Sequence, residues 1–227
     1  MLNIAVIVNT LAVLIGSTLG FFTGKKLPDR FRQILFTAIG ALTIGLGVRL
    51  FLDYNNALVV LGSLVLGVIV GEILDIEKQI GRLAGKKDSE KFVKGFITAT
   101  VLFLAGPMTI IGSISAGLEG NNEIIFVKSL MDGISSVMLA ASFGAGVFLS
   151  AGSVYVVQGS LVTLAAYLSF LGGELYIGDF SAVGGLILLM LGVRLMSIKE
   201  IRVGNFLPAL VFSPALSYFA KLISEKL

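Results

Sequence analysis

The sequence contains no cysteine, no histidine and no tryptophan among its 227 residues. Structural zinc, haem and iron–sulfur centres take Cys or His as ligands, so we expect none of them and predict no cofactor. Catalysis by a Cys nucleophile or by a His acid–base group is excluded for the same reason. A hard cation bound by carboxylate, hydroxyl and carbonyl oxygens remains compatible with the residues present.

Charged residues are also scarce. They make up 14% of the chain, against about a quarter in a typical soluble domain, while 56% of residues are hydrophobic and the mean hydropathy is +0.99. The net charge of +3 is too small to indicate a nucleic-acid partner. The sequence also has no P-loop or dinucleotide fingerprint, so we do not expect an enzyme. The composition predicts an all-α polytopic membrane protein whose main partner is the lipid bilayer.

The apolar runs predict eight membrane spans, because a spanning helix needs about 20 mostly apolar residues. The predicted spans are 2–22, 31–52, 57–74, 92–118, 124–149, 154–171, 180–196 and 203–223. The fourth is interrupted by Gly106-Pro107. Proline has no backbone N–H to donate, so we expect a broken helix there.

The loops alternate in charge along the chain. The loops after the first, third and seventh spans carry Lys and Arg, whereas those after the fourth and sixth carry only acids, including Glu174 and Asp179. Basic loops favour the cytoplasmic side. We therefore predict that both termini lie on the outer side of the membrane.

The second and seventh spans share the sequence Leu-Gly-Val-Arg-Leu. Gly40, Gly47 and Arg49 match Gly185, Gly192 and Arg194 at a separation of 145 residues. The two spans should run in opposite directions, as in the inverted-topology repeats of many secondary transporters. We predict one membrane domain over 1–227, built from a first repeat (1–75), a central helix pair (92–149) and a second repeat (154–227). Chance similarity between Gly- and Leu-rich helices is the alternative.

Asp132 is the acid inside the fifth predicted span. An ionisable residue at membrane depth is by default a candidate functional site. Asp132 is therefore the candidate ligand for a monovalent cation or a proton. The candidate oxygen donors near it are Thr109, Ser113 and Ser136. The structural alternative is an ion pair with Lys128, one helical turn earlier.

Three amides lie within other predicted spans: Asn9, Gln158 and Asn205. Such amides often form hydrogen bonds between helices, and they can also line a transport path. We include all three in the candidate substrate- or ion-binding set. Small residues spaced by four, such as Gly16 and Gly20, favour close helix packing and a homodimer as one arrangement.

Several segments resemble one known family. GPMTIIGSISAGLEG, KSLMDGISSVMLAASFGAGVFLSA, VVQGSLVTLAA and GNFLPAL are similar to the domain of unknown function 554 family, the YqgA/YdfK-like prokaryotic membrane proteins. The resemblance covers essentially the whole chain and implies an integral inner-membrane protein, described as a sodium channel or pump without an established substrate. The family often has Ala at the position of Pro107, so a proline break is not a feature shared by all members.

These observations lead to three hypotheses. The first is a gradient-driven transporter or channel for a small ion or solute, with a midplane site near Asp132. The second is a membrane scaffold or regulatory subunit without a transport path, in which Lys128 neutralises Asp132. An intramembrane enzyme is the weakest reading, because Glu72 and Asp132 are expected near opposite membrane faces.

Overall fold

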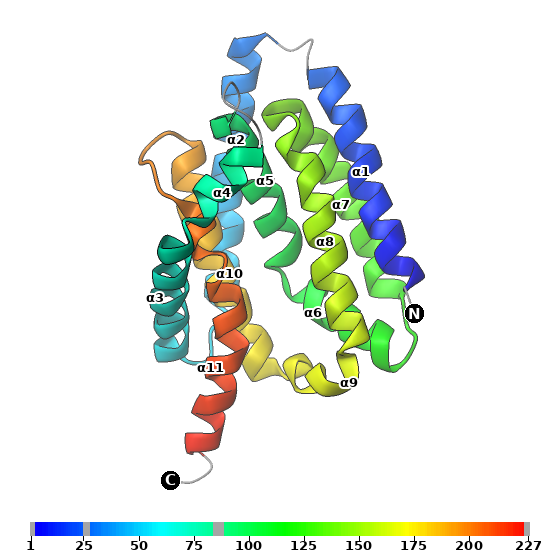
Figure 1. Ribbon diagram of the computed structural model, residues 1–227, viewed down its shortest axis with the longest axis vertical. Helices are drawn as coiled ribbons and strands as arrows, with labels where there is room; N and C mark the ends of the chain where they lie inside the picture. Colours follow the sequence, from blue (N-terminus) through cyan, green and yellow to red (C-terminus); the bar gives the residue numbers. More distant parts are fainter. Residues whose placement is uncertain (1–2, 25–27, 84–88, 225–227) are drawn as a thin grey trace. The chain divides into compact units, whose positions relative to one another are not determined.

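A computed structural model describes residues 3–24, 28–83 and 89–224 of the chain, and within these residues it is helical throughout, with no strand. Figure 1 shows the helices in chain order. They are α1 (Ile4–Gly24), α2 (Asp29–Phe51), α3 (Ala57–Leu74), α4 (Ile76–Leu83), α5 (Ser89–Leu104), α6 (Pro107–Leu118), α7 (Glu123–Phe143), α8 (Gly146–Thr163), α9 (Ala165–Leu168), the 3-10 turn η1 (Ser169–Gly172), α10 (Glu174–Leu195), the 3-10 turn η2 (Val203–Phe206) and α11 (Ala209–Ser224).

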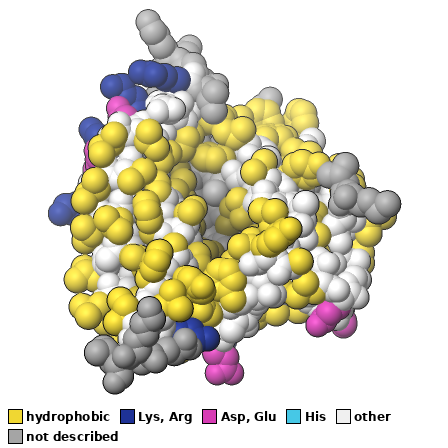
Figure 2. All heavy atoms as spheres, turned by 60° about the horizontal axis from the view of Figure 1, so that its bottom comes forward, with side chains coloured by type: hydrophobic (Ala, Val, Ile, Leu, Met, Phe, Trp, Pro, Cys, Tyr) yellow, Lys and Arg dark blue, Asp and Glu magenta, His cyan; other side chains and the backbone are white. Residues whose placement is uncertain are grey.

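Seven segments of the described chain are long and apolar enough to cross a membrane, and the bent pair of α5 and α6 supplies an eighth. The predicted all-α class and the number of spans are therefore confirmed. Figure 2 shows apolar side chains over most of the visible face, with charged side chains at its margins. Parts of two predicted basic loops, residues 25–27 and 84–88, lie outside the described residues.

The break in the fourth span is confirmed, since α5 and α6 meet at an angle of 58°. In an unbroken helix the carbonyl of Phe103 would accept a hydrogen bond from the backbone N–H of residue 107, and Pro107 has none. The Thr109 hydroxyl donates to this carbonyl instead, at 2.9 Å. A side chain thus replaces the missing backbone donor, as membrane helices require where their backbone is interrupted.

Three helix boundaries differ from those expected. The fifth helix ends at Phe143, and α8 begins at Gly146, because Gly144 turns the chain with a φ of 79° that glycine adopts without strain. The sixth helix ends at Thr163 and is followed by α9 and η1. The seventh begins at Glu174, so Asp179 lies inside α10 and not in an acidic loop.

The described chain forms two compact units that interleave in sequence. The first contains residues 1–36, 80–104 and 108–169, and so includes α1, α7, α8 and nearly all of α5 and α6. The second contains residues 37–79, 105–107 and 170–227, and so includes most of α2 together with α3, α10 and α11.

In the first unit, α1 packs directly on α7 through glycines spaced by four residues. A Cβ on Gly16 would clash with the carbonyl of Gly133, and a Cβ on Gly20 would clash with the carbonyl of Val137. The close packing predicted for these glycines is confirmed. These glycines let the backbones of α1 and α7 approach closely. In a bilayer, van der Waals contact of this kind holds helices together, because lipid offers no hydrophobic driving force for their association.

Gly20→Ala is expected to destabilise the protein by about 1–3 kcal/mol, because the added methyl group must push α1 away from α7. Gly152→Ala is the matched control, since no atom lies within 4 Å of a Cβ built on that glycine. Thermal unfolding of the purified protein, followed by circular dichroism, measures both variants. Equal midpoints for Gly20→Ala and Gly152→Ala would contradict the tight α1–α7 contact.

In the second unit, the two helices of the proposed repeat cross in opposite directions. A Cβ on Gly47 would lie 2.7 Å from the carbonyl oxygen of Gly185, and a Cβ on Gly192 would lie 2.7 Å from that of Gly40. The four glycines that match at a separation of 145 residues therefore form the contact where the two helices cross. The contact shows that the two helices run antiparallel, and the inverted repeat itself stays a prediction.

Candidate functional site: a buried polar cluster on α1, α7 and α8

An ion pair lies at the centre of the candidate site. Lys128 and Asp132 are one turn apart on α7, and the Lys128 Nζ lies 2.8 Å from both carboxylate oxygens of Asp132. The two side chains are 8% and 7% exposed, respectively. The alternative considered for Asp132, a pair with Lys128, is therefore present, and the charges of the pair sum to zero.

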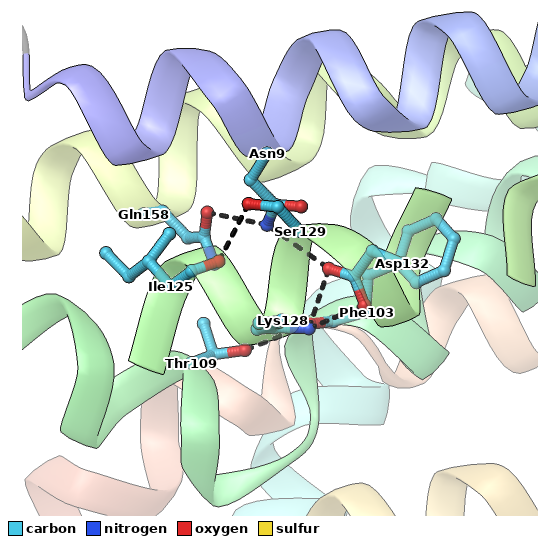
Figure 3. Close-up of polar contacts among 8 residues, drawn as sticks. All are labelled: Asn9, Phe103, Thr109, Ile125, Lys128, Ser129, Asp132 and Gln158. Atoms are coloured by element: carbon cyan, nitrogen blue, oxygen red, sulfur yellow. Dashed lines mark hydrogen bonds and ion pairs between the residues drawn. The ribbon is translucent and has the colours of Figure 1, made fainter. Parts of the chain in front are cut away.

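Two amides from other helices complete the cluster. Asn9 on α1 and Gln158 on α8 are both fully buried. The Asn9 Nδ2 donates to Asp132 Oδ2 at 3.2 Å and to Gln158 Oε1 at 3.0 Å. Figure 3 shows Asn9 between the carboxylate and Gln158. The structure thus brings together three of the predicted site residues, and adds Lys128.

The cluster has unused hydrogen-bonding capacity. Asn9 Oδ1 and Gln158 Nε2 are buried and have no hydrogen-bond partner. An unsatisfied buried polar atom costs about 1–3 kcal/mol. The two amides therefore offer one acceptor and one donor to a molecule that enters the cluster.

The three hydroxyl residues predicted near Asp132 are buried but differ in their partners. Thr109 donates to the Phe103 carbonyl, and Ser136 donates to the Gly133 carbonyl at 2.7 Å. Ser113, on α6, is fully buried, and its hydroxyl has no partner. Of the three, Ser113 therefore has the hydroxyl that remains free to bind a further group.

A cation at Asp132 would have to compete with Lys128. Asp132 is the acid of this cluster, and both its oxygens already accept from the Lys128 Nζ. Within residues 3–24, 28–83 and 89–224, no group of three or more His, Cys, Asp or Glu side chains is arranged to hold a metal ion. A monovalent cation at Asp132 therefore stays a prediction.

Asn205, the third predicted amide, belongs to the second unit. Its Oδ1 accepts from the backbone N–H of Glu77 at 2.9 Å, and its Nδ2 donates to Glu72 Oε1 at 2.9 Å. Its side chain is fully buried. Asn205 therefore connects η2 to the α3–α4 corner and is not part of the Asp132 cluster.

A second buried ion pair was not anticipated from the sequence. Arg194 Nη2 lies 2.6 Å from Glu77 Oε1, and the Arg194 side chain is 6% exposed. Glu77 Oε2 also accepts from the backbone N–H of Gly204. Glu77 lies outside the predicted spans, and Arg194 is in the predicted seventh span, so the sequence alone did not pair them. The amphipathic pattern of 76–83 is the signal that could have placed Glu77 on a packed helix.

Asp179 is a further buried acid that sequence reasoning placed in a loop. It is 2% exposed on α10 and accepts from the backbone N–H groups of Asn55 and Asn56 and from the Ser217 hydroxyl. Asn56 caps the N-terminus of α3, where a negative charge is favourable. The arrangement gives Asp179 a structural role at the start of α3.

Comparisons with known proteins agree with the membrane fold. The chain is 28% identical over 216 residues to the uncharacterised membrane protein YdfK of Bacillus subtilis. The matched region covers 93% of this chain and 94% of the relative. It is 31% identical over 221 residues to the uncharacterised protein YqgA of Escherichia coli, which covers 92% and 94%. No solved structure matches the chain. Residues 4–218 match the model of the protein family of unknown function DUF554, so the resemblance noted in the sequence is confirmed and the chain belongs to this family of membrane proteins.

Proposed function

We propose that this protein is a gradient-driven transporter or channel for a small ion or solute. The buried cluster of Asn9, Lys128, Asp132 and Gln158 is its binding site. In this proposal the protein acts in a prokaryotic inner membrane with both termini outside, and a homodimer is the arrangement that its small-residue faces favour. The observation that supports the proposal is the free amide acceptor and donor beside an ion pair inside the helical unit.

The cost of such a cluster argues for a role beyond stability. A buried ion pair is often no more stabilising than apolar residues of similar volume. Ionisable residues inside membrane segments are rare, and they mark substrate or ion pathways. The break between α5 and α6 adds an interrupted helix, which transporters use where substrates bind near the midplane.

A scaffold or regulatory subunit is the second candidate. The observation that favours it is the short contact of Lys128 with both oxygens of Asp132, which leaves no net charge for an ion. A scaffold needs no path through the first unit. It therefore predicts that substitutions in the cluster change stability without changing the permeability of a membrane that contains the protein.

We expect Gln158→Leu to reduce solute flux at least tenfold while leaving the ion pair intact, because it removes the free amide donor of the cluster. Purified protein in liposomes is tested by light scattering in isosmotic glycerol and urea and by dye-detected flux of Na⁺ and K⁺. Gln79→Leu on α4, at an exposed position, is the matched control. Flux equal to that of protein-free liposomes for every solute and ion would favour the scaffold.

A further inference from the structure

An open groove of about 570 Å³ lies between α1 and α8 in the first unit. Its lining combines aliphatic side chains with hydroxyl and amide groups, and it includes no charged residue. The lining residues are Asn3, Val6, Tyr155, Val156, Gly159, Ser160, Val162, Thr163 and Leu164. The groove therefore offers hydrogen bonds to a ligand without a counter-charge for an ion.

The groove borders the polar cluster on both helices. Val6 lies one turn before Asn9 on α1, and Gly159 directly follows Gln158 on α8. Asn9 and Gln158 are the residues whose Oδ1 and Nε2 lack partners. Asn9 and Gln158 do not themselves line the groove and are fully buried, so a molecule in the groove reaches the free acceptor and the free donor only when α1 and α8 separate beside Val6 and Gly159.

The groove has open space at Gly159. A Cβ built on Gly159 would meet no atom within 4 Å. The same holds for Gly152, two turns earlier on α8, which does not line the groove. The two glycines differ in whether they face the groove, which makes them a matched pair for an experiment.

We propose that the groove between α1 and α8 is the entrance to the polar cluster and admits uncharged polar molecules that both donate and accept hydrogen bonds. This inference rests on the transport proposal above and narrows its substrate class. An ion entering the groove would lose hydration without meeting a charged side chain, which is costly in a low-dielectric region. The cluster itself is neutral, because Lys128 and Asp132 pair with each other.

The chain has no cysteine, so single cysteines can be labelled without a background. We would compare Gly159→Cys in the groove, Thr163→Cys one turn nearer the end of α8, and Gly152→Cys as the control. Ser160→Cys serves as a second groove position if Gly159→Cys does not fold. Each protein is incubated in liposomes with three methanethiosulfonates, the uncharged methyl, the cationic trimethylammonioethyl and the anionic sulfonatoethyl reagent, and adducts are followed by mass spectrometry.

We expect the uncharged reagent to modify Gly159→Cys at least tenfold faster than Gly152→Cys. The charged reagents should modify Thr163→Cys at least tenfold faster than Gly159→Cys. If the charged reagents react equally fast at both groove positions, the path admits ions and the proposed substrate class is wrong. If Gly159→Cys reacts no faster than Gly152→Cys with the uncharged reagent, the groove is covered by lipid or by another copy of the chain and is not an entrance.

Labelling and flux separate the two proposals. Labelling requires no transported substrate, so groove accessibility is measured even if no solute in the flux panel crosses the membrane. Flux that Gln158→Leu abolishes, combined with equal labelling of Gly159→Cys and Gly152→Cys, would retain the transport proposal and reject the groove. Flux of Na⁺ or K⁺ without flux of glycerol or urea would also reject the groove as an entrance for neutral molecules.

Discussion

Arg194→Met is expected to lower the free energy of unfolding by about 3–5 kcal/mol, the usual cost of breaking a buried ion pair by removing one partner. Arg49→Met, in the matching Leu-Gly-Val-Arg-Leu segment of α2, should change it by less than about 0.5 kcal/mol, as for most surface substitutions. Arg49 is exposed, whereas Arg194 lies 2.6 Å from the buried carboxylate of Glu77.

The difference follows from what each substitution leaves behind. Removing Arg194 leaves Glu77 buried with the backbone N–H of Gly204 as a remaining donor. Arg49 is exposed, so its removal does not leave a buried charge without its partner. Unfolding of the purified proteins in detergent, followed by circular dichroism, measures both. The double variant Arg194→Met/Glu77→Leu should recover much of the stability, since no buried charge remains unpaired and Glu200, the second partner of Arg194, is 65% exposed. Equal losses for Arg194→Met and Arg49→Met would show that the ion pair does not contribute to stability.

Lys128→Met is expected to destabilise the protein by about 3–5 kcal/mol, because it leaves the Asp132 carboxylate buried without a counter-ion. The double variant Lys128→Met/Asp132→Leu should recover most of this loss, since apolar residues can replace a buried ion pair at little cost. Lys78→Met is the control, because Lys78 forms an exposed pair with Asp75 that is worth at most about 1 kcal/mol.

This double variant also separates the two functional hypotheses. If the cluster is a transport site, Lys128→Met/Asp132→Leu will be stable and will lose solute flux in liposomes. If the protein is a scaffold, the double variant will be stable and membrane permeability will not change. A double variant that is as unstable as Lys128→Met alone would contradict the view that the unpaired charge causes the loss.

Part of the candidate site could be predicted from the sequence because its geometry is local. Lys128 and Asp132 are four residues apart on one helix, so their pairing follows from helical periodicity. The break at Pro107 follows from a missing backbone donor within the same span. The close packing of Gly16 and Gly20 against a neighbouring helix follows from their spacing, although the identity of the neighbour does not.

Other features required the tertiary structure. Asn9 and Gln158 are 149 residues apart, and only the packing of α1 and α8 brings their amides within hydrogen-bonding distance. Asn205 was grouped with them by residue type, but it joins η2 to the α3–α4 corner. Arg49 and Arg194 share a motif, yet Arg49 is exposed whereas Arg194 meets a buried carboxylate, because α4 places Glu77 beside α10.

The membrane class, the number of spans and the broken helix could be predicted from the sequence, and the ion pair on α7 was one of two alternatives that it left open for Asp132. Each of these depends on hydropathy or on contacts within about one helical turn. The tertiary structure decided which polar groups meet between helices, which amide atoms remain free, and where the groove between α1 and α8 lies. Lipid removes the hydrophobic preference for particular helix faces, so packing of small residues and hydrogen bonds selects the partners, and these are read only from the folded chain.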